Sequence, residues 1–206
     1  MRRIGHRGAK GHAPDNTIES FQKAIDLGCD EVETDVWLMP DGSFVIAHDR
    51  PGSSAGLLTL DGVLDFCRGH VDVNVELKCA DSDASARETG ERVGAHVARR
   101  GDASVYLSSF WWSALEGARA AASAVRRAYI FSSSPPRAAL IAEARKTGLW
   151  GLHPSYRYVT EELVRDAHAA GLKVQPWTAN EPADIARLVA LGVDGIASDF
   201  PERVPR

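Results

Sequence analysis

The chain alternates two patterns of hydrophobic positions. Short apolar runs rich in β-branched residues predict strands, and the longer stretches between them repeat apolar residues every three or four positions, as amphipathic helices do. An additional strand is expected to return from the second one, because Asp41-Gly42 is a strong tight-turn signal. The eight principal strands are predicted at Arg3–His6, Glu31–Trp37, Val71–Leu77, Ser104–Leu107, Arg127–Phe131, Leu149–His153, Lys173–Trp177 and Gly195–Ser198, and the returning strand at Phe44–His48.

Helices are predicted between these strands. The first opens at Asn16, with Glu19 three residues later completing a capping box. The others are predicted at Thr59–Arg68, Ala84–Arg100, Ser113–Ala122, Pro136–Thr147, Thr160–Ala170 and Pro182–Leu191. Several end at a glycine suited to a left-handed helix cap, namely Gly28, Gly101, Gly148, Gly171 and Gly192.

The strict alternation of strands and helices indicates an α/β fold with a parallel sheet. Eight repeats favour a closed (β/α)8 barrel, or TIM barrel, and a doubly wound open sheet is the alternative. With 206 residues the barrel would be compact, and Pro201–Arg206 leave no room for a full eighth helix. No internal repeat, low-complexity segment or linker marks a boundary, so residues 1–206 are expected to form a single domain.

Composition and charge narrow the function classes. A formal net charge of −4 gives no basic surface for nucleic acid, and no apolar run approaches the roughly 20 residues that cross a bilayer. No hydrophobic signal-peptide segment follows Arg2-Arg3, and the three cysteines match no metal spacing, which indicates reduced thiols. We therefore expect a cytoplasmic protein without stable membrane association, and the sequence does not indicate its oligomeric state.

Residues with catalytic potential recur at the carboxyl ends of the predicted strands. Side chains two apart in a strand share a face, so Glu33 and Asp35 point the same way. In a barrel, the rim at the carboxyl ends of the strands is where active sites form, whereas random surface charge would fall at both ends. The residues at these ends are His6, Arg7, Glu33, Asp35, His48, Glu76, Lys78 and Trp177.

The acidic residues of this set predict a metal site. Glu33, Asp35 and Glu76 would repel one another without a cation, and their hard oxygen ligands suit Mg²⁺ or Ca²⁺. Zinc fits less well, because no cysteine or paired histidine accompanies them. Arg7 and Lys78 can supply positive charge to an anionic substrate.

Two histidines complete the set. His6 and His48 can give and take protons near neutral pH. Each residue alone also has a structural interpretation: Glu-x-Lys is commonly an ion pair, Trp177 would fit a core, and Glu31, which shares a face with Glu33, would fit a solvated acidic surface. Together, two histidines, three acids and two bases indicate metal-assisted phosphoryl chemistry.

The motifs resemble those of the glycerophosphodiester phosphodiesterases, in family order over nearly the whole chain. The resemblance rests on His6-Arg7-Gly8, Pro14-Asp15-Asn16-Thr17, Glu33-Thr34-Asp35, His48-Asp49, Glu76-Leu77-Lys78, Ser109-Phe110, Trp177-Thr178-Ala179-Asn180 and the closing motif from Gly195 to Pro201. It implies a barrel hydrolase acting on a small phosphodiester with one divalent cation, Mg²⁺ or Ca²⁺. By position it implies metal ligands at Glu33, Asp35 and Glu76, an acid–base pair at His6 and His48, phosphate contacts at Arg7 and Lys78, and a pocket wall at Trp177; Glu31 has no ligand role.

The chain departs from the family pattern at two places. Asp15 replaces the usual Glu, and a short segment follows His48-Asp49 where family members commonly carry a Leu-x-Arg-Thr-Thr-like stretch and a small inserted cap subdomain. Because the cap helps to shape the pocket for the head group in family members, the sequence does not identify the head group of the substrate.

The expected activity is metal-dependent hydrolysis of glycerophosphodiesters to glycerol phosphate and an alcohol. One alternative is a relative that cleaves lysophospholipid or sphingolipid head groups, although no amphipathic membrane-surface stretch is found. The other is a non-catalytic phosphate-binding barrel, although a pure binder has no need of two proton carriers. The sequence assigns neither the general acid nor the nucleophile, which is either water or a substrate hydroxyl.

Overall fold

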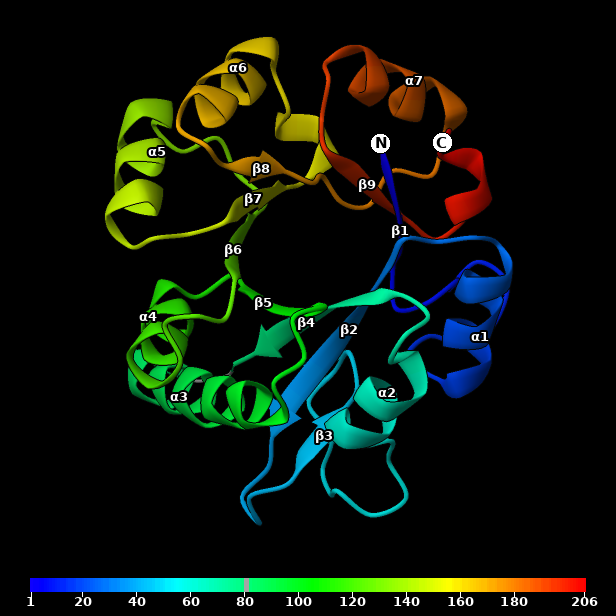
Figure 1. The fold of residues 1–206 in the computed structure, drawn as a ribbon, viewed down its shortest axis with the longest axis vertical. Coiled ribbons are helices and arrows are strands. Elements are labelled where there is room, and N and C mark those ends of the chain that lie inside the picture. The colour runs from blue at the N-terminus through cyan, green and yellow to red at the C-terminus, as the bar shows by residue number, and fades with distance from the viewer. Residues whose placement is uncertain (80–81) are drawn as a thin grey trace.

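The computed structural model describes residues 1–79 and 82–206, and its strands form a nearly closed parallel barrel with the helices outside (Figure 1). The strands follow one another around the barrel in the order β8-β7-β6-β5-β4-β2-β1-β9. Their bounds are Arg2–Gly5 (β1), Glu31–Leu38 (β2), Asp72–Lys78 (β4), Val105–Ser109 (β5), Arg127–Phe131 (β6), Gly151–Pro154 (β7), Lys173–Val174 (β8) and Gly195–Ser198 (β9). The predicted α/β barrel is therefore confirmed.

The seam between β8 and β9 shows why the barrel is only nearly closed. The Asp194 N–H donates to the Val174 carbonyl at 2.8 Å, and the Ala197 N–H donates to the Pro176 carbonyl at 2.9 Å. Pro176 has no N–H to donate in return, so regular pairing stops early. The strand predicted at Lys173–Trp177 is accordingly regular only over Lys173–Val174.

The helices cover the outside of the strands. They are α1 (Ile18–Asp26), α2 (Leu60–Cys67), α3 (Asp83–Arg100), α4 (Trp112–Ala121), α5 (Arg137–Lys146), α6 (Glu161–Ala169) and α7 (Pro182–Ala190), with short 3₁₀ turns η1 (Tyr156–Tyr158) and η2 (Pro201–Arg203). The turn η2 stands where an eighth helix would, as predicted. The five glycines expected to end helices all have a left-handed φ, between 65° and 78°. None of the described helices is both long and apolar enough to span a membrane.

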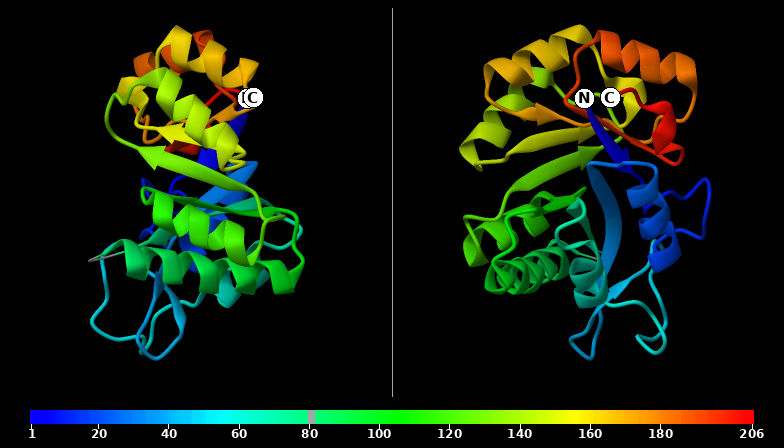
Figure 2. Two further views of the ribbon diagram at one scale, coloured as in Figure 1. Left: turned by 90° about the vertical axis from the view of Figure 1, so that its left-hand side faces the viewer. Right: turned by 45° about the vertical axis from the view of Figure 1, so that its right-hand side comes forward.

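A hairpin extends from one side of the barrel. Strand β3 (Phe44–Ile46) pairs antiparallel with the end of β2, and Gly42 turns between them with φ 86°. The returning strand is shorter than the predicted Phe44–His48, since regular pairing ends at Ile46, although the Ala47 N–H still donates to the Asp35 carbonyl at 3.2 Å. On the other edge of β3, the Ile46 N–H donates to the Leu58 carbonyl at 2.8 Å. Residues 47–59 then lead to α2 without a cap subdomain, and this region projects beyond the barrel at the lower end of the views (Figure 2).

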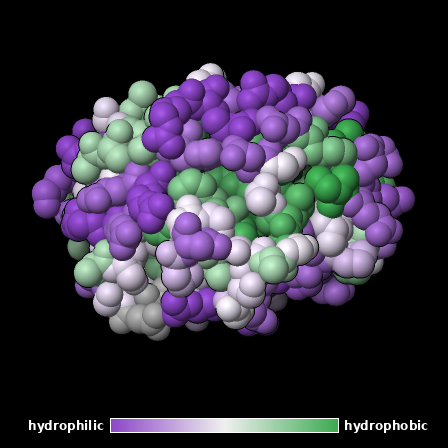
Figure 3. Space-filling model, turned by 90° about the horizontal axis from the view of Figure 1, so that it is seen from below, coloured by the Kyte–Doolittle hydropathy of each residue, from purple (hydrophilic) through white to green (hydrophobic). Residues whose placement is uncertain are grey.

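The buried side chains form two large clusters and one small one. The large clusters lie in the first and second halves of the chain, whereas the small one lies in the projecting region. This hairpin cluster consists of Trp37, Met39 and Val45, with Ala47 and Leu57 packed against them. Seen from the hairpin end, the surface is mostly hydrophilic, with hydrophobic residues gathered in a central hollow (Figure 3).

Candidate active site

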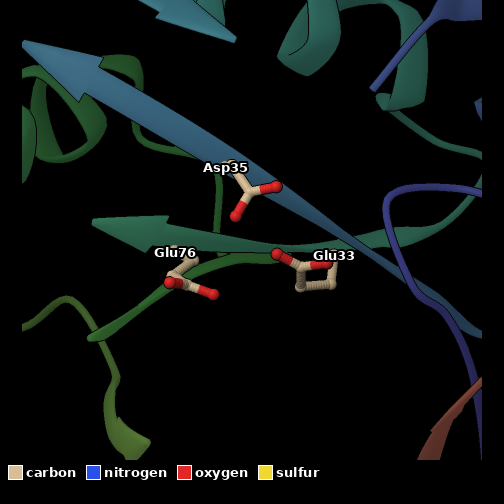
Figure 4. Close-up of side chains that lie close together, drawn as sticks. All are labelled: Glu33, Asp35 and Glu76. Atoms are coloured by element: carbon tan, nitrogen blue, oxygen red, sulfur yellow. The ribbon is translucent and has the colours of Figure 1, made fainter. Parts of the chain in front are cut away.

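Three carboxylates converge where β2 and β4 lie side by side. The register places Asp35 directly opposite Glu76, and Glu33 lies two residues earlier on the same face of β2. One carboxylate oxygen from each of the three lies within 4.8 Å of the others. The side chains point toward one another from the two strands (Figure 4). The structure therefore brings together the three residues that the sequence nominates as metal ligands.

Burial and mutual repulsion make this cluster unstable as three bare anions. Burial, followed by the charges of Asp35 and Glu76, raises the pKa of Glu33 well above its ordinary value. Burial and the charge of Asp35 likewise raise the pKa of Glu76 to about 7. A divalent cation would remove this penalty, because it replaces the lost hydration and the repulsion at once.

Arg7 holds the cluster from the β1 side. Its backbone N–H donates to Glu33 Oε2 at 3.0 Å, and its Nε lies 3.1 Å from Asp35 Oδ2. Its Nη1 donates to Asp15 Oδ2 at 3.0 Å, so Asp15 still reaches the arginine where family members carry a longer Glu. Burial alone would lower the pKa of Arg7, but the charges of Asp35, Glu33 and Asp15 and the hydrogen bond to Asp15 together outweigh burial and raise the pKa.

Lys78 holds the cluster from the β4 side. Its ammonium donates to Glu76 Oε1 at 2.9 Å and lies 3.4 Å from Asp35 Oδ1. Two cations thus face three carboxylates, and Glu33 Oε1 is buried with no hydrogen-bond donor among the described residues. The carboxylates outnumber the cationic side chains, and Glu33 Oε1 lacks a hydrogen-bond donor in the described part of the chain. Such a set of buried oxygen atoms fits a hard divalent cation.

Asn16 is a site residue that the sequence assigned to a helix cap. The cap of α1 is instead Thr17, whose side chain accepts from the Ser20 N–H. Asn16 has a left-handed φ of 58°, and its Nδ2 donates to Asp35 Oδ2 at 2.8 Å while its Oδ1 accepts from Thr34 Oγ1. Asparagine tolerates this backbone conformation better than most residues, which lets it turn toward the carboxylate.

His6 is held by a chain of half-buried hydrogen bonds that sequence analysis did not assign. Its Nδ1 lies 2.6 Å from Asp199 Oδ1, and Asp199 also accepts from Asn180 Nδ2 at 2.7 Å. Burial would raise the pKa of Asp199, but the hydrogen bonds from His6 and Asn180, together with the nearby positive charge, outweigh burial and lower the pKa. Asp199 is therefore a carboxylate that accepts the Nδ1 proton, and His6 Nε2 remains toward the cluster, 4.0 Å from Glu33 Oε2.

His48 lies in a different setting. Its side chain is 42% exposed, and its Nδ1 pairs with Asp49 at 2.9 Å, a carboxylate that is 95% exposed. It lines an open cleft of about 740 Å³ together with Arg7, Asp15 and Leu58. The structure thus places His48 on the same open cleft as the arginine of the cluster.

Trp177 lines the inside of the barrel below the cluster. It borders a cavity of about 30 Å³ with His6, Glu33 and Glu76. Its indole N–H donates to the His153 carbonyl at 2.9 Å. Its ring and that of Phe110 form a T-shaped pair whose centroids lie 5.5 Å apart. The partly exposed Phe110 extends this aromatic wall, although only its motif marked it in the sequence.

The sequence contains a signal for the site residues that sequence analysis did not assign. Asn16, Asn180 and Asp199 all lie inside motifs that carry the resemblance, but a motif does not say which atoms meet. Glu31, in contrast, lies outside the cluster. It is buried rather than on the solvated surface considered from the sequence, because it accepts from the Tyr106 hydroxyl at 2.5 Å and pairs with Arg2.

Known proteins match the chain over nearly its whole length. Residues 6–55 and 50–203 match the glycerophosphoryl diester phosphodiesterase family. A glycerophosphodiester phosphodiesterase of Caldanaerobacter subterraneus is 29% identical, over 97% of this chain and 94% of the relative. The first match ends and the second begins at residues 50–55, where the sequence lacks the inserted cap.

Two solved structures share the fold. A phosphodiesterase of Oleispira antarctica, in complex with the product sn-glycerol-3-phosphate, superposes with a TM-score of 0.87 at 27% identity, covering 99% of this chain and 95% of the other. A protein of Silicibacter pomeroyi that is assigned as a glycerophosphoryl diester phosphodiesterase superposes with a TM-score of 0.86 at 29% identity, covering 99% of this chain and 91% of the other. With the family match spanning the chain, this protein belongs to the glycerophosphoryl diester phosphodiesterase family and is a phosphoric diester hydrolase.

Proposed function

We propose that residues 1–206 form a single phosphodiesterase domain that hydrolyses glycerophosphodiesters to glycerol phosphate and an alcohol with the help of one divalent cation, Mg²⁺ or Ca²⁺. The observation that carries this proposal is the buried cluster of Glu33, Asp35 and Glu76, with an imidazole nitrogen of His6 facing it. The product complex of the Oleispira relative supports the same choice of substrate.

The metal would be held by Glu33, Asp35 and Glu76. When bound, it would neutralise charge that grows on the phosphoryl oxygens. Arg7 and Lys78 flank these acids and are placed to attract the phosphate, because each has polar hydrogens beyond those spent on carboxylates. Trp177 and Phe110 would form an apolar wall against the substrate body.

The two histidines would move the protons. In-line displacement at phosphorus requires a proton to be taken on one side and delivered on the other. His6 offers Nε2, because Asp199 occupies its Nδ1 side. His48 comes from the hairpin region, lines the same cleft as Arg7, and would supply the second proton carrier.

A panel of glycerophosphodiesters, assayed with EDTA and then with added Mg²⁺ or Ca²⁺, tests the proposal. Hydrolysis is expected to stop on chelation and to return with the cation, and Glu33→Gln should reduce kcat by about 10³-fold even with metal present. Glu31→Gln is the matched control on the same strand face, and it should keep its response to metal. Full activity in a chelated preparation would rule out the metal assignment.

The same panel separates an enzyme from a binding protein. If glycerophosphodiesters bind and shift the melting temperature but no product forms with any cation, the non-catalytic barrel is the better description. Preference for lysophospholipids over water-soluble diesters would instead favour the lipid head-group alternative.

A further inference from the structure

Trp37 lies where the active site meets the hairpin. It follows Glu33 and Asp35 at a spacing of two in β2, so the three side chains share a face. In register, Trp37 stands opposite Lys78 of β4 on one side and Val45 of β3 on the other. Its side chain is almost fully buried, and it is the largest member of the hairpin cluster.

The indole of Trp37 reaches the backbone of His48. Its Nε1–H donates to the His48 carbonyl at 3.4 Å, a long hydrogen bond. The neighbouring Ala47 packs against the same cluster, and its N–H donates to the Asp35 carbonyl at 3.2 Å. Leu57 packs on the cluster from the returning loop, so the residues before and after His48 are fastened to one small core.

The His48 side chain has little else to fix it. It is 42% exposed, and its ionic partner Asp49 lies almost entirely in solvent. An exposed ion pair of this kind contributes little, because water and salt screen it and both side chains lose freedom. The direction of the imidazole is therefore set mainly by where the backbone of His48 is held.

We propose that Trp37 is a positioning residue for His48, acting through the packing of the hairpin cluster and the indole–carbonyl hydrogen bond. This inference rests on the proposed role of His48 as a proton carrier. A proton carrier works only within hydrogen-bond reach of the reacting oxygen, and a displacement of about 1 Å can cost up to 10²-fold in rate.

Two substitutions separate packing from the hydrogen bond. Trp37→Phe keeps an aromatic ring in the cluster but removes the N–H, and Trp37→Ala removes both. We expect kcat on a glycerophosphodiester to fall about tenfold for Trp37→Phe and about 100-fold for Trp37→Ala, with KM changed less than kcat. Trp150→Phe is the matched control, because that partly buried indole packs at a tilted angle against Tyr106, outside the hairpin cluster. Its kcat should stay within about twofold of wild type.

A double-mutant cycle tests whether Trp37 acts through His48. In a His48→Ala background, Trp37→Phe should cause no further loss of kcat, since the group it positions is gone. An equal loss in both backgrounds would overturn the proposal, and so would a kcat for Trp37→Phe within twofold of wild type. Melting temperatures of all variants show whether any loss comes from unfolding.

An NMR measurement keeps the test independent of the proposed function. The ring ¹H–¹⁵N correlations of His48, assigned by comparison with the His48→Ala spectrum, should shift in Trp37→Phe and remain unchanged in Trp150→Phe. Unchanged His48 signals in Trp37→Phe would overturn the positioning role. If His48→Ala itself keeps wild-type turnover, the acid–base scheme fails, while the His48 signals still decide whether Trp37 orients that ring.

Discussion

The two histidines of the site are held in opposite ways. His6 leaves the end of a barrel strand, is 13% exposed and hydrogen-bonds to Asp199, which Asn180 fixes in turn. His48 leaves a projecting hairpin, is 42% exposed and pairs with the fully solvated Asp49. The imidazole of His6 is thus oriented by a half-buried chain of polar partners, and that of His48 by the backbone and packing of the hairpin region.

This difference has consequences for energetics. A buried hydrogen bond to a carboxylate is strong and directional, and losing one partner leaves the other unpaired. An exposed ion pair contributes little and is screened by salt. We therefore expect the orientation of His6 to depend on its particular polar partners, and the orientation of His48 to depend on the packing of the hairpin region.

The largest effects are expected from removing either imidazole. His6→Ala and His48→Ala should each lower kcat by about 10²–10⁴-fold with a smaller change in KM, because a general acid or base acts in the transition state. Steady-state kinetics on glycerophosphodiesters measure this. If both variants turned over a natural diester at nearly the wild-type rate, both histidines would be structural and the comparison would lose its functional meaning.

A change of leaving group sharpens the comparison by assigning the roles. A p-nitrophenyl ester needs almost no protonation of the departing oxygen, because nitrophenolate is a good leaving group. The variant that lacks the general acid should therefore recover much of its rate on this ester, and the variant that lacks the base should not. Equal recovery in both variants would contradict a division of labour between His6 and His48.

The polar chain behind His6 is the next target. Asp199→Asn should lower kcat by about 10–100-fold, because the amide holds the imidazole less well and cannot balance its positive charge. The melting temperature is the control for folding. A kcat equal to that of wild type would show that the barrel strand alone orients His6.

Asn16 tests the buried side of the metal cluster. Asn16→Gly keeps the left-handed backbone conformation but removes the amide that donates to Asp35. The concentration of Mg²⁺ or Ca²⁺ that gives half-maximal activity should rise about tenfold. An unchanged metal requirement would mean that Asp35 is oriented by Arg7 and Lys78 alone.

The smallest effect is expected at Asp49. Asp49→Asn should change kcat by less than about threefold, since the exposed carboxylate is screened by water and salt. The matched comparison is Asp199→Asn, the same substitution behind the other histidine. If the two variants lost equal activity, the difference in exposure between the two carboxylates would not determine how much each histidine depends on its partner.

Local sequence patterns were sufficient to predict the barrel and the residues that make up its site. Strand and helix periodicities are local, so each predicted strand and helix has a counterpart in the fold, and the glycines at helix ends were recognisable from the left-handed turn that glycine allows. Spacing of two within a strand was enough to put Glu33 and Asp35 on one face. The motifs also identified the family, because they occur in order along the chain.

How these residues meet depends on contacts between segments that are far apart in the chain. His6 and Asp199 are 193 residues apart and come together because β1 pairs with β9, a contact that no local pattern encodes. Asn16 does not cap the helix as expected, because its side chain hydrogen-bonds to the buried carboxylate of Asp35. Strand β8 is shorter than expected, because Pro176 cannot donate a hydrogen bond across the seam. Whether a histidine ends buried beside a carboxylate or exposed on a hairpin depends on packing between distant segments, and therefore on the closed fold.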